Sequence, residues 1–139
     1  MASASARINL PYTPGRVWSV IGGFGSLPEW LPFILHSQLS EGGRVRHLVG
    51  PQGAAIVERL MAFDEHGRSY SYAILEAPFP VIDYSSTLRV KDVDGGSRVE
   101  WFGEFIATKV SDAEATKLFQ GIYEDGLKAL ATHLATNAD

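Results

Sequence analysis

A long amphipathic helix predicted at the C-terminal end limits how the rest of this chain can fold. The helix begins at Ser111-Asp112-Ala113-Glu114, a capping box with serine at the N-cap and glutamate three residues later. At about 100° per residue, one half of its surface is apolar. That half carries Ala115, Leu118, Phe119, Ile122, Tyr123, Leu130 and Leu134. Such a face has to be buried against the segments that precede it.

Those preceding segments are predicted to be strands of an antiparallel sheet. Alternating apolar residues indicate strands at 33–40, 44–49, 54–63, 68–76, 83–92 and 97–107, with a further strand at 5–12. Hairpin-type turns rich in glycine and acidic residues separate most of them, which is typical of a meander. A sheet of about seven strands that curves around one helix encloses more space than the helix fills, so we expect an internal cavity.

Two short helices are predicted after the first strand. The first begins at Thr13-Pro14, with threonine as N-cap and proline at the first helical position, and ends at Gly22-Gly23. The second is capped by Ser26 and ends before Pro32. Together with the sheet and the C-terminal helix, they predict an α+β fold.

Composition narrows the classes of partner. The chain has 139 residues, a net charge of −4 and no cysteine, and its basic residues are scattered singly. A nucleic-acid binder generally carries a clustered basic stripe, and a membrane span needs about 20 apolar residues. We therefore predict a single cytoplasmic domain over residues 1–139, with no nucleic-acid partner and no membrane insertion. The oligomeric state is left open.

Motifs for metals and cofactors are lacking in the sequence. The four histidines, His36, His47, His66 and His133, have no metal-ligand spacing. No Gly-x-Ser-x-Gly segment or P-loop occurs, and the glycines of residues 22–25 lack the context of a dinucleotide fingerprint. We expect neither a metal nor a cofactor.

Several stretches resemble a known superfamily. They are VWSVIGGFGSLPEWLP (17–32), GGRVRHL (42–48), ERL (58–60), RSYSYAI (68–74), PFPVIDY (78–84) and YEDGLKAL (123–130). In these stretches and in the order of elements, the chain is similar to the START-like or SRPBCC superfamily, also called helix-grip or Bet v 1-like. Within it, the chain resembles the polyketide cyclase/dehydrase-like group. Leu31 departs from the group, whose members often have histidine after the tryptophan.

Arg46 and Glu58 are the charged residues of greatest interest. They lie at what look like facing positions of two strands, among apolar neighbours. The periodicity of the Glu58 strand is ambiguous, because both of its faces are fairly apolar: Ile56, Glu58, Leu60 and Ala62 on one, Val57, Arg59, Met61 and Phe63 on the other. The resemblance implies that the pair faces inward. The alternative is an exposed cross-strand pair worth less than about 1 kcal/mol.

Aromatic residues are predicted to line the cavity beside this pair. Tyr70, Tyr72, Tyr84 and Trp101 take the inward positions of their strands, and Phe119 and Tyr123 take the apolar face of the last helix. The same pattern also suits an ordinary packed core. Gly126 lies in that apolar face, where it either leaves a notch for a ligand or admits a close strand. The resemblance implies lid positions for Pro51 and Phe79, and Trp30 is placed to roof the cavity.

The leading hypothesis is a module that binds a small hydrophobic ligand, lipid-like or aromatic and polyketide-like, in an internal cavity. The alternative is a polyketide cyclase/dehydratase-like enzyme in which Glu58 is the acid or base and Tyr72 or Arg46 stabilises enolate charge. Against the enzyme, Arg46 is expected to lower the pKa of Glu58. A third hypothesis, a protein-interaction domain, requires an exposed apolar patch. The sequence leaves open which of these is correct.

Overall fold

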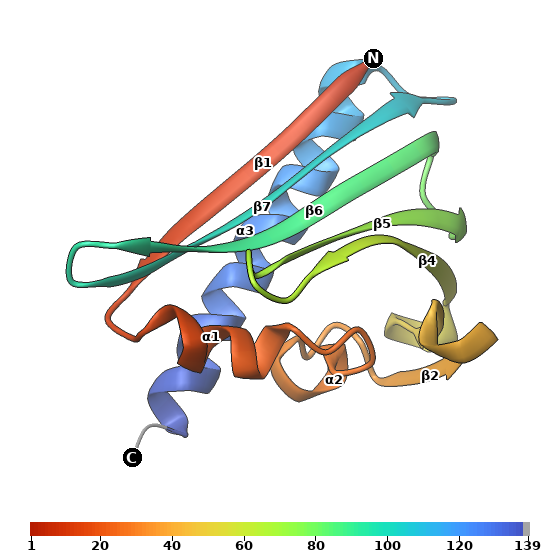
Figure 1. The fold of residues 1–139 in the computed structure, drawn as a ribbon. Coiled ribbons are helices and arrows are strands. Elements are labelled where there is room, and N and C mark those ends of the chain that lie inside the picture. The colour runs from red at the N-terminus through yellow and green to blue at the C-terminus, as the bar shows by residue number, and fades with distance from the viewer. Residues whose placement is uncertain (138–139) are drawn as a thin grey trace.

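The computed structural model describes residues 1–137 and shows a curved sheet wrapped along one long helix (Figure 1). In chain order the elements are β1 (Ala2–Leu10), α1 (Pro14–Ile21), α2 (Leu27–Trp30), β2 (His36–Ser40), η1 (Glu41–Gly43), β3 (Val45–Val49), η2 (Pro51–Gly53), β4 (Ala55–Asp64), β5 (Ser69–Glu76), β6 (Val81–Val93), β7 (Gly96–Ala107) and α3 (Asp112–Thr136). The seven strands are antiparallel in the order β1-β7-β6-β5-β4-β3-β2. The predicted helix-grip fold is confirmed.

Capping explains where two of the helices begin. The Thr13 hydroxyl accepts a hydrogen bond from the Arg16 N–H at 3.2 Å, and Ser111 accepts one from the Glu114 N–H at 3.1 Å. Ser26 is the N-cap residue of α2, as predicted, but its hydroxyl does not make the capping hydrogen bond. The hydroxyl donates instead to the carbonyl of Gly23 at 2.8 Å.

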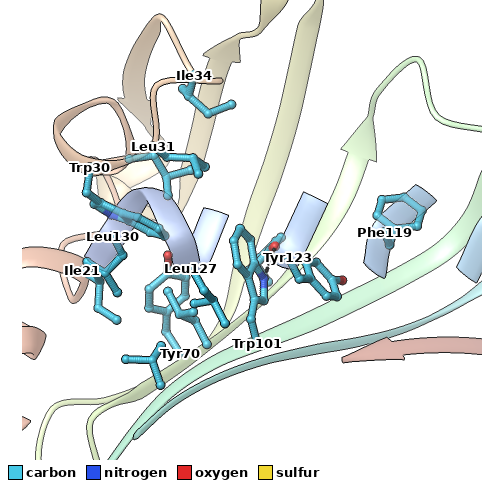
Figure 2. Packing of buried hydrophobic residues seen from close by; sticks show 14 of the residues in the cluster. Ile21, Trp30, Leu31, Ile34, Tyr70, Trp101, Phe119, Tyr123, Leu127 and Leu130 are labelled. Carbon is cyan, nitrogen blue, oxygen red and sulfur yellow. Dashed lines mark hydrogen bonds between the residues drawn. The ribbon is translucent and has the colours of Figure 1, made fainter. Parts of the chain in front are cut away.

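The inner face of the sheet is built from alternate residues of β5, β6 and β7. Register places Tyr70 beside Leu88 and Leu88 beside Trp101, so large side chains from three strands stand in one row. On α3, Phe119, Tyr123, Leu127 and Leu130 are buried against this face, as Figure 2 shows. The core therefore lies between the concave sheet and α3.

A β-bulge changes which side chains of β4 point toward the inner face of the sheet. The register with β5 shifts between Leu60 and Ala62, so Phe63 rather than Ala62 continues the inner face. The Phe63 ring lies 5.7 Å from that of Trp18 and 6.5 Å from that of Tyr70. The prediction that Ala62 shares the face of Glu58 is wrong, because a bulge adds one residue and reverses the alternation that follows it.

Gly126 is a point of close packing between α3 and the sheet. A Cβ atom there would lie 2.6 Å from Cζ3 of Trp101 and 3.1 Å from Cδ1 of Leu31. The space predicted as a ligand notch is thus filled by the edge of the Trp101 indole. The alternative, close approach of a strand, describes this glycine.

Alanine substitutions at the two glycines of α3 should have opposite effects on stability. Nothing lies within 4 Å of a Cβ at Gly121, so Gly121→Ala should raise the free energy of unfolding by the helix-propensity gain of about 1 kcal/mol. Gly126→Ala should lower it by about 1–2 kcal/mol, because overpacking against Trp101 exceeds the same gain. Urea denaturation measures both, and an equal gain at the two positions would mean that Trp101 moves away without strain.

Candidate functional site

A small, partly open cavity lies between the inner face of the sheet and α3. It is lined by Leu27, Leu31, Phe33, Ile34, Arg46, Leu48, Ile56, Glu58, Tyr72, Ile74, Phe79, Tyr84, Trp101, Phe119, Ile122 and Tyr123. All of these are aliphatic or aromatic except Arg46 and Glu58. The volume is about 50 Å³, whereas pockets for drug-sized ligands are typically about 300–1,000 Å³. Aromatic side chains fill most of the space that the curved sheet encloses.

Arg46 and Glu58 form a buried ion pair at one end of the cavity. They are direct cross-strand partners of β3 and β4. Nε of Arg46 donates to Oε1 of Glu58 at 2.8 Å, and Nη2 lies 2.8 Å from the same oxygen. Their side chains are 1% and 8% exposed, so the alternative of an exposed surface pair is wrong.

Arg46 is also held from the side opposite Glu58. Its Nη1 donates to the backbone carbonyl of Phe24 at 3.1 Å and to the Tyr70 hydroxyl at 3.2 Å. The guanidinium carbon lies 4.2 Å from the ring centroid of Phe24, 4.7 Å from that of Tyr72 and 5.5 Å from that of Tyr70. Phe24 was missed in the sequence, although it stands alone between two glycines in a predicted loop.

Burial raises the pKa of the Glu58 carboxyl, and the charge and hydrogen bonds of Arg46 offset only part of that rise. Arg46 lowers this pKa, as expected, but desolvation is the larger effect, so the pKa lies above its ordinary value. Both guanidinium contacts reach Oε1, and no donor within residues 1–137 bonds Oε2. The second oxygen is therefore the open part of this carboxylate.

Tyrosine hydroxyls form the remaining polar groups of the cavity. Nε1 of Trp101 donates to the Tyr72 hydroxyl at 3.1 Å. The hydroxyls of Tyr84 and Tyr123 hydrogen-bond each other, and that of Tyr123 also donates to Oγ of Ser86 at 3.3 Å. Burial raises the pKa of Tyr123 to about 12 and those of Tyr72 and Tyr84 well above their ordinary value. All three phenols are neutral near pH 7.

The predicted lining residues separate into two groups. Tyr72, Tyr84, Trp101, Phe119 and Tyr123 line the cavity together with the ion pair, and Figure 2 shows the rings of Trp101 and Tyr123 side by side. Tyr70 lies behind them, where it contacts Arg46 and stacks with Phe63 rather than facing the cavity.

The three predicted lid residues have different positions. Phe79 lies in the β5–β6 connection, half-buried, and its ring is 5.3 Å from that of Phe119. Pro51 is exposed in η2 and does not line the cavity. Trp30 is 2% exposed and packs against Trp101 with ring centroids 6.1 Å apart, so it belongs to the core rather than to a lid.

A second space, called the groove here, lies between α3 and the segment that follows α2 and adjoins the cavity. Leu31, Phe33 and Ile122 line both spaces, and Gly126 borders only the groove, whose volume is about 270 Å³. Phe33 and Ile122 were not among the predicted site residues. Of these two residues, Phe33 is the more accessible, since its exposed fraction is 38%.

Within residues 1–137, no three or more His, Cys, Asp or Glu side chains converge as metal ligands would. No helix there combines the length and the apolarity that crossing a membrane requires.

Comparisons with known proteins agree with this architecture. A family model described as polyketide cyclase / dehydrase and lipid transport matches residues 1–135. The protein XoxI from Bacillus cereus is 51% identical, with a TM-score of 0.93 over 95% of this chain and 94% of its own. A protein from Bacillus thuringiensis is 48% identical, with a TM-score of 0.94 over 96% and 99%. Ara h 8.0201, 20% identical over 97% and 98% with a TM-score of 0.71, shares the fold.

Removing the cation from the buried pair should make stability depend on pH. Arg46→Met should lower the free energy of unfolding at pH 7 by about 3–5 kcal/mol, because a buried carboxylate is left without its partner. Without Arg46, the folded-state pKa of Glu58 rises further above the unfolded value of 4.5. The folded protein then binds the proton more tightly, so stability falls as pH rises from 4.5 through the folded pKa.

The matched control is the double variant Arg46→Met/Glu58→Gln, which has no ionisable group in the pair. Denaturant unfolding between pH 4 and pH 8 compares the two proteins. The difference in free energy of unfolding between them should widen with rising pH. A constant difference would mean that Glu58 does not titrate in this range.

Proposed function

Because the chain belongs to the polyketide cyclase / dehydrase and lipid transport family, we propose that it binds a small hydrophobic ligand between its sheet and α3. The observation that carries this proposal is the lining of the cavity. Its walls are aliphatic and aromatic, and their two charges, Arg46 and Glu58, are concentrated at one end. Apolar walls with a few convergent polar groups are typical of small-molecule sites.

The volume of the cavity implies that binding requires movement at its boundary. About 50 Å³ holds a few water molecules but not a lipid chain. Phe33 and Phe79 are the partly exposed cavity side chains that lie outside both the helices and the strands. Rotation of either ring away from the cavity enlarges it without disturbing the sheet hydrogen bonds. We infer that a ligand enters on the side of these rings.

A second candidate function is supported by the state of Glu58. Its pKa is raised by burial, its Oε2 has no donor from residues 1–137, and Tyr72, a neutral phenol, lines the same cavity. A carboxylate in this state can remove a proton next to a substrate carbonyl while Tyr72 hydrogen-bonds the enolate oxygen. The carboxyl group then returns this proton to the hydroxyl on the neighbouring carbon. That hydroxyl leaves as water, and a conjugated carbonyl compound is formed.

Ligand binding is tested by obstructing the cavity from α3. In Ile122→Trp, the larger side chain should occupy the boundary between cavity and groove and weaken binding at least ten-fold. Leu118→Trp is the matched control, since Leu118 lies one turn earlier on α3, is 37% exposed and does not line the cavity. The probe is ethylbenzene, titrated while the NMR signal of the Trp101 indole N–H is followed. Equal affinity in both variants would place the ligand elsewhere.

Catalysis is tested with an aryl β-hydroxy ketone, whose dehydration product absorbs in the ultraviolet. If the enzyme hypothesis is correct, Glu58→Gln should reduce the rate at least about 100-fold, the usual contribution of a general base. Its affinity for ethylbenzene should stay within about two-fold of the wild type. Absence of turnover in the wild-type protein, with ethylbenzene bound, would favour the binding module alone.

A further inference from the structure

Most of the hydrogen-bonding capacity of Arg46 is used by the protein itself. Each of its three guanidinium nitrogens has a protein oxygen within 3.2 Å: Glu58 Oε1 for Nε and Nη2, and Phe24 O and Tyr70 Oη for Nη1. The rings of Phe24, Tyr70 and Tyr72 surround the same group. These contacts engage at most four of its five N–H groups, so an anionic ligand group can bond only the remaining N–H of Nη2 without breaking one of them.

Glu58, in contrast to Arg46, presents a hydrogen-bond acceptor to the cavity. Oε1 is engaged by Arg46, whereas Oε2 accepts nothing from residues 1–137 and its residue lines the cavity. A carboxylate oxygen accepts hydrogen bonds and repels other carboxylates. The polar group that completes this end of the cavity is therefore a hydrogen-bond donor without negative charge.

Tyr72 narrows the choice among donors. Its ring lies against the guanidinium of Arg46, its hydroxyl oxygen accepts from Nε1 of Trp101, and the hydroxyls of Ser86 and Tyr84 are further hydrogen-bonding neighbours of the same group. A hydroxyl group is both donor and acceptor and can bond Glu58 and Tyr72 together. An ammonium group has no acceptor for Tyr72, and it would also face the charge of Arg46.

We propose that the ligand of this cavity is a neutral hydroxyl compound, a phenol or an alcohol on an apolar body, and that the site discriminates against carboxylates. Its hydroxyl donates to Oε2 of Glu58 and accepts from Tyr72, while its apolar body lies among Trp101, Phe119 and Phe79. This inference rests on the proposed binding function. It assigns the recognition of the polar group to Glu58 and Tyr72, and it gives Arg46 the role of positioning Glu58.

The test compares four ligands with the same ethyl-substituted ring. They are 4-ethylphenol, which donates and accepts; 4-ethylanisole, which only accepts; 4-ethylbenzoate, an anion; and ethylbenzene, which has no polar group. Titration at pH 7 follows the NMR signal of the Trp101 indole N–H. We expect 4-ethylphenol to bind about 10- to 100-fold more tightly than 4-ethylanisole, the range for one hydrogen bond to a charged group. We expect 4-ethylbenzoate to bind most weakly.

Glu58→Gln provides the decisive variant. Arg46 retains the amide oxygen in the position of Oε1, so the amide NH₂ takes the position of Oε2 and presents a donor to the ligand. The preference for 4-ethylphenol over 4-ethylanisole should fall to within about two-fold, and 4-ethylbenzoate should bind more tightly than it does to the wild type. A well-dispersed NMR spectrum of the variant shows that it is folded.

The outcomes separate this inference from the proposed function. If the four ligands bind the wild-type protein equally, or if 4-ethylbenzoate binds best, the cavity is a ligand site but the hydroxyl inference is overturned. An unchanged preference for 4-ethylphenol in Glu58→Gln overturns it as well. If ethylbenzene and 4-ethylphenol both leave the Trp101 signal unmoved at millimolar concentration, the proposed binding function fails and the inference fails with it.

Discussion

The arrangement of the site depends on the contacts that the buried guanidinium of Arg46 makes. This group links β3 to β4 through Glu58, to β5 through Tyr70, and to the connection between α1 and α2 through the carbonyl of Phe24. A buried cation needs this number of acceptors, because each unmet donor would lose its hydration without replacement. The Arg46 side chain therefore connects the segment between α1 and α2 to strands β3, β4 and β5.

Because of this arrangement, the two charged groups of the pair are not equally available to the cavity. Arg46 is surrounded by acceptors and aromatic faces, whereas Glu58 keeps one oxygen toward the cavity. Buried ion pairs add little net stability, since desolvation opposes the Coulomb attraction. In the functions proposed above, the role of this pair is to orient a carboxylate within an apolar space.

The secondary structure followed closely from the sequence because its signals are local. The caps at Thr13 and Ser111 and the alternation of β5, β6 and β7 depend on neighbours a few residues away. Two features departed from these local rules. The bulge in β4 adds one residue to the alternation, and the Ser26 hydroxyl bonds the carbonyl of Gly23 three residues earlier rather than an N–H of α2, neither of which periodicity reports.

The sequence by itself determined the order of elements, the inward tyrosines and the presence of a charged pair on facing strands. Each of these follows from the periodicity of apolar residues or from a hairpin turn. Only the tertiary structure decided how the interior is divided. The close approach of α3 at Gly126 brings Trp101 into the space expected for a ligand. The side on which the acceptors of Arg46 lie leaves one oxygen of Glu58 open. Both depend on contacts between residues far apart in the chain, and no local pattern encodes such contacts.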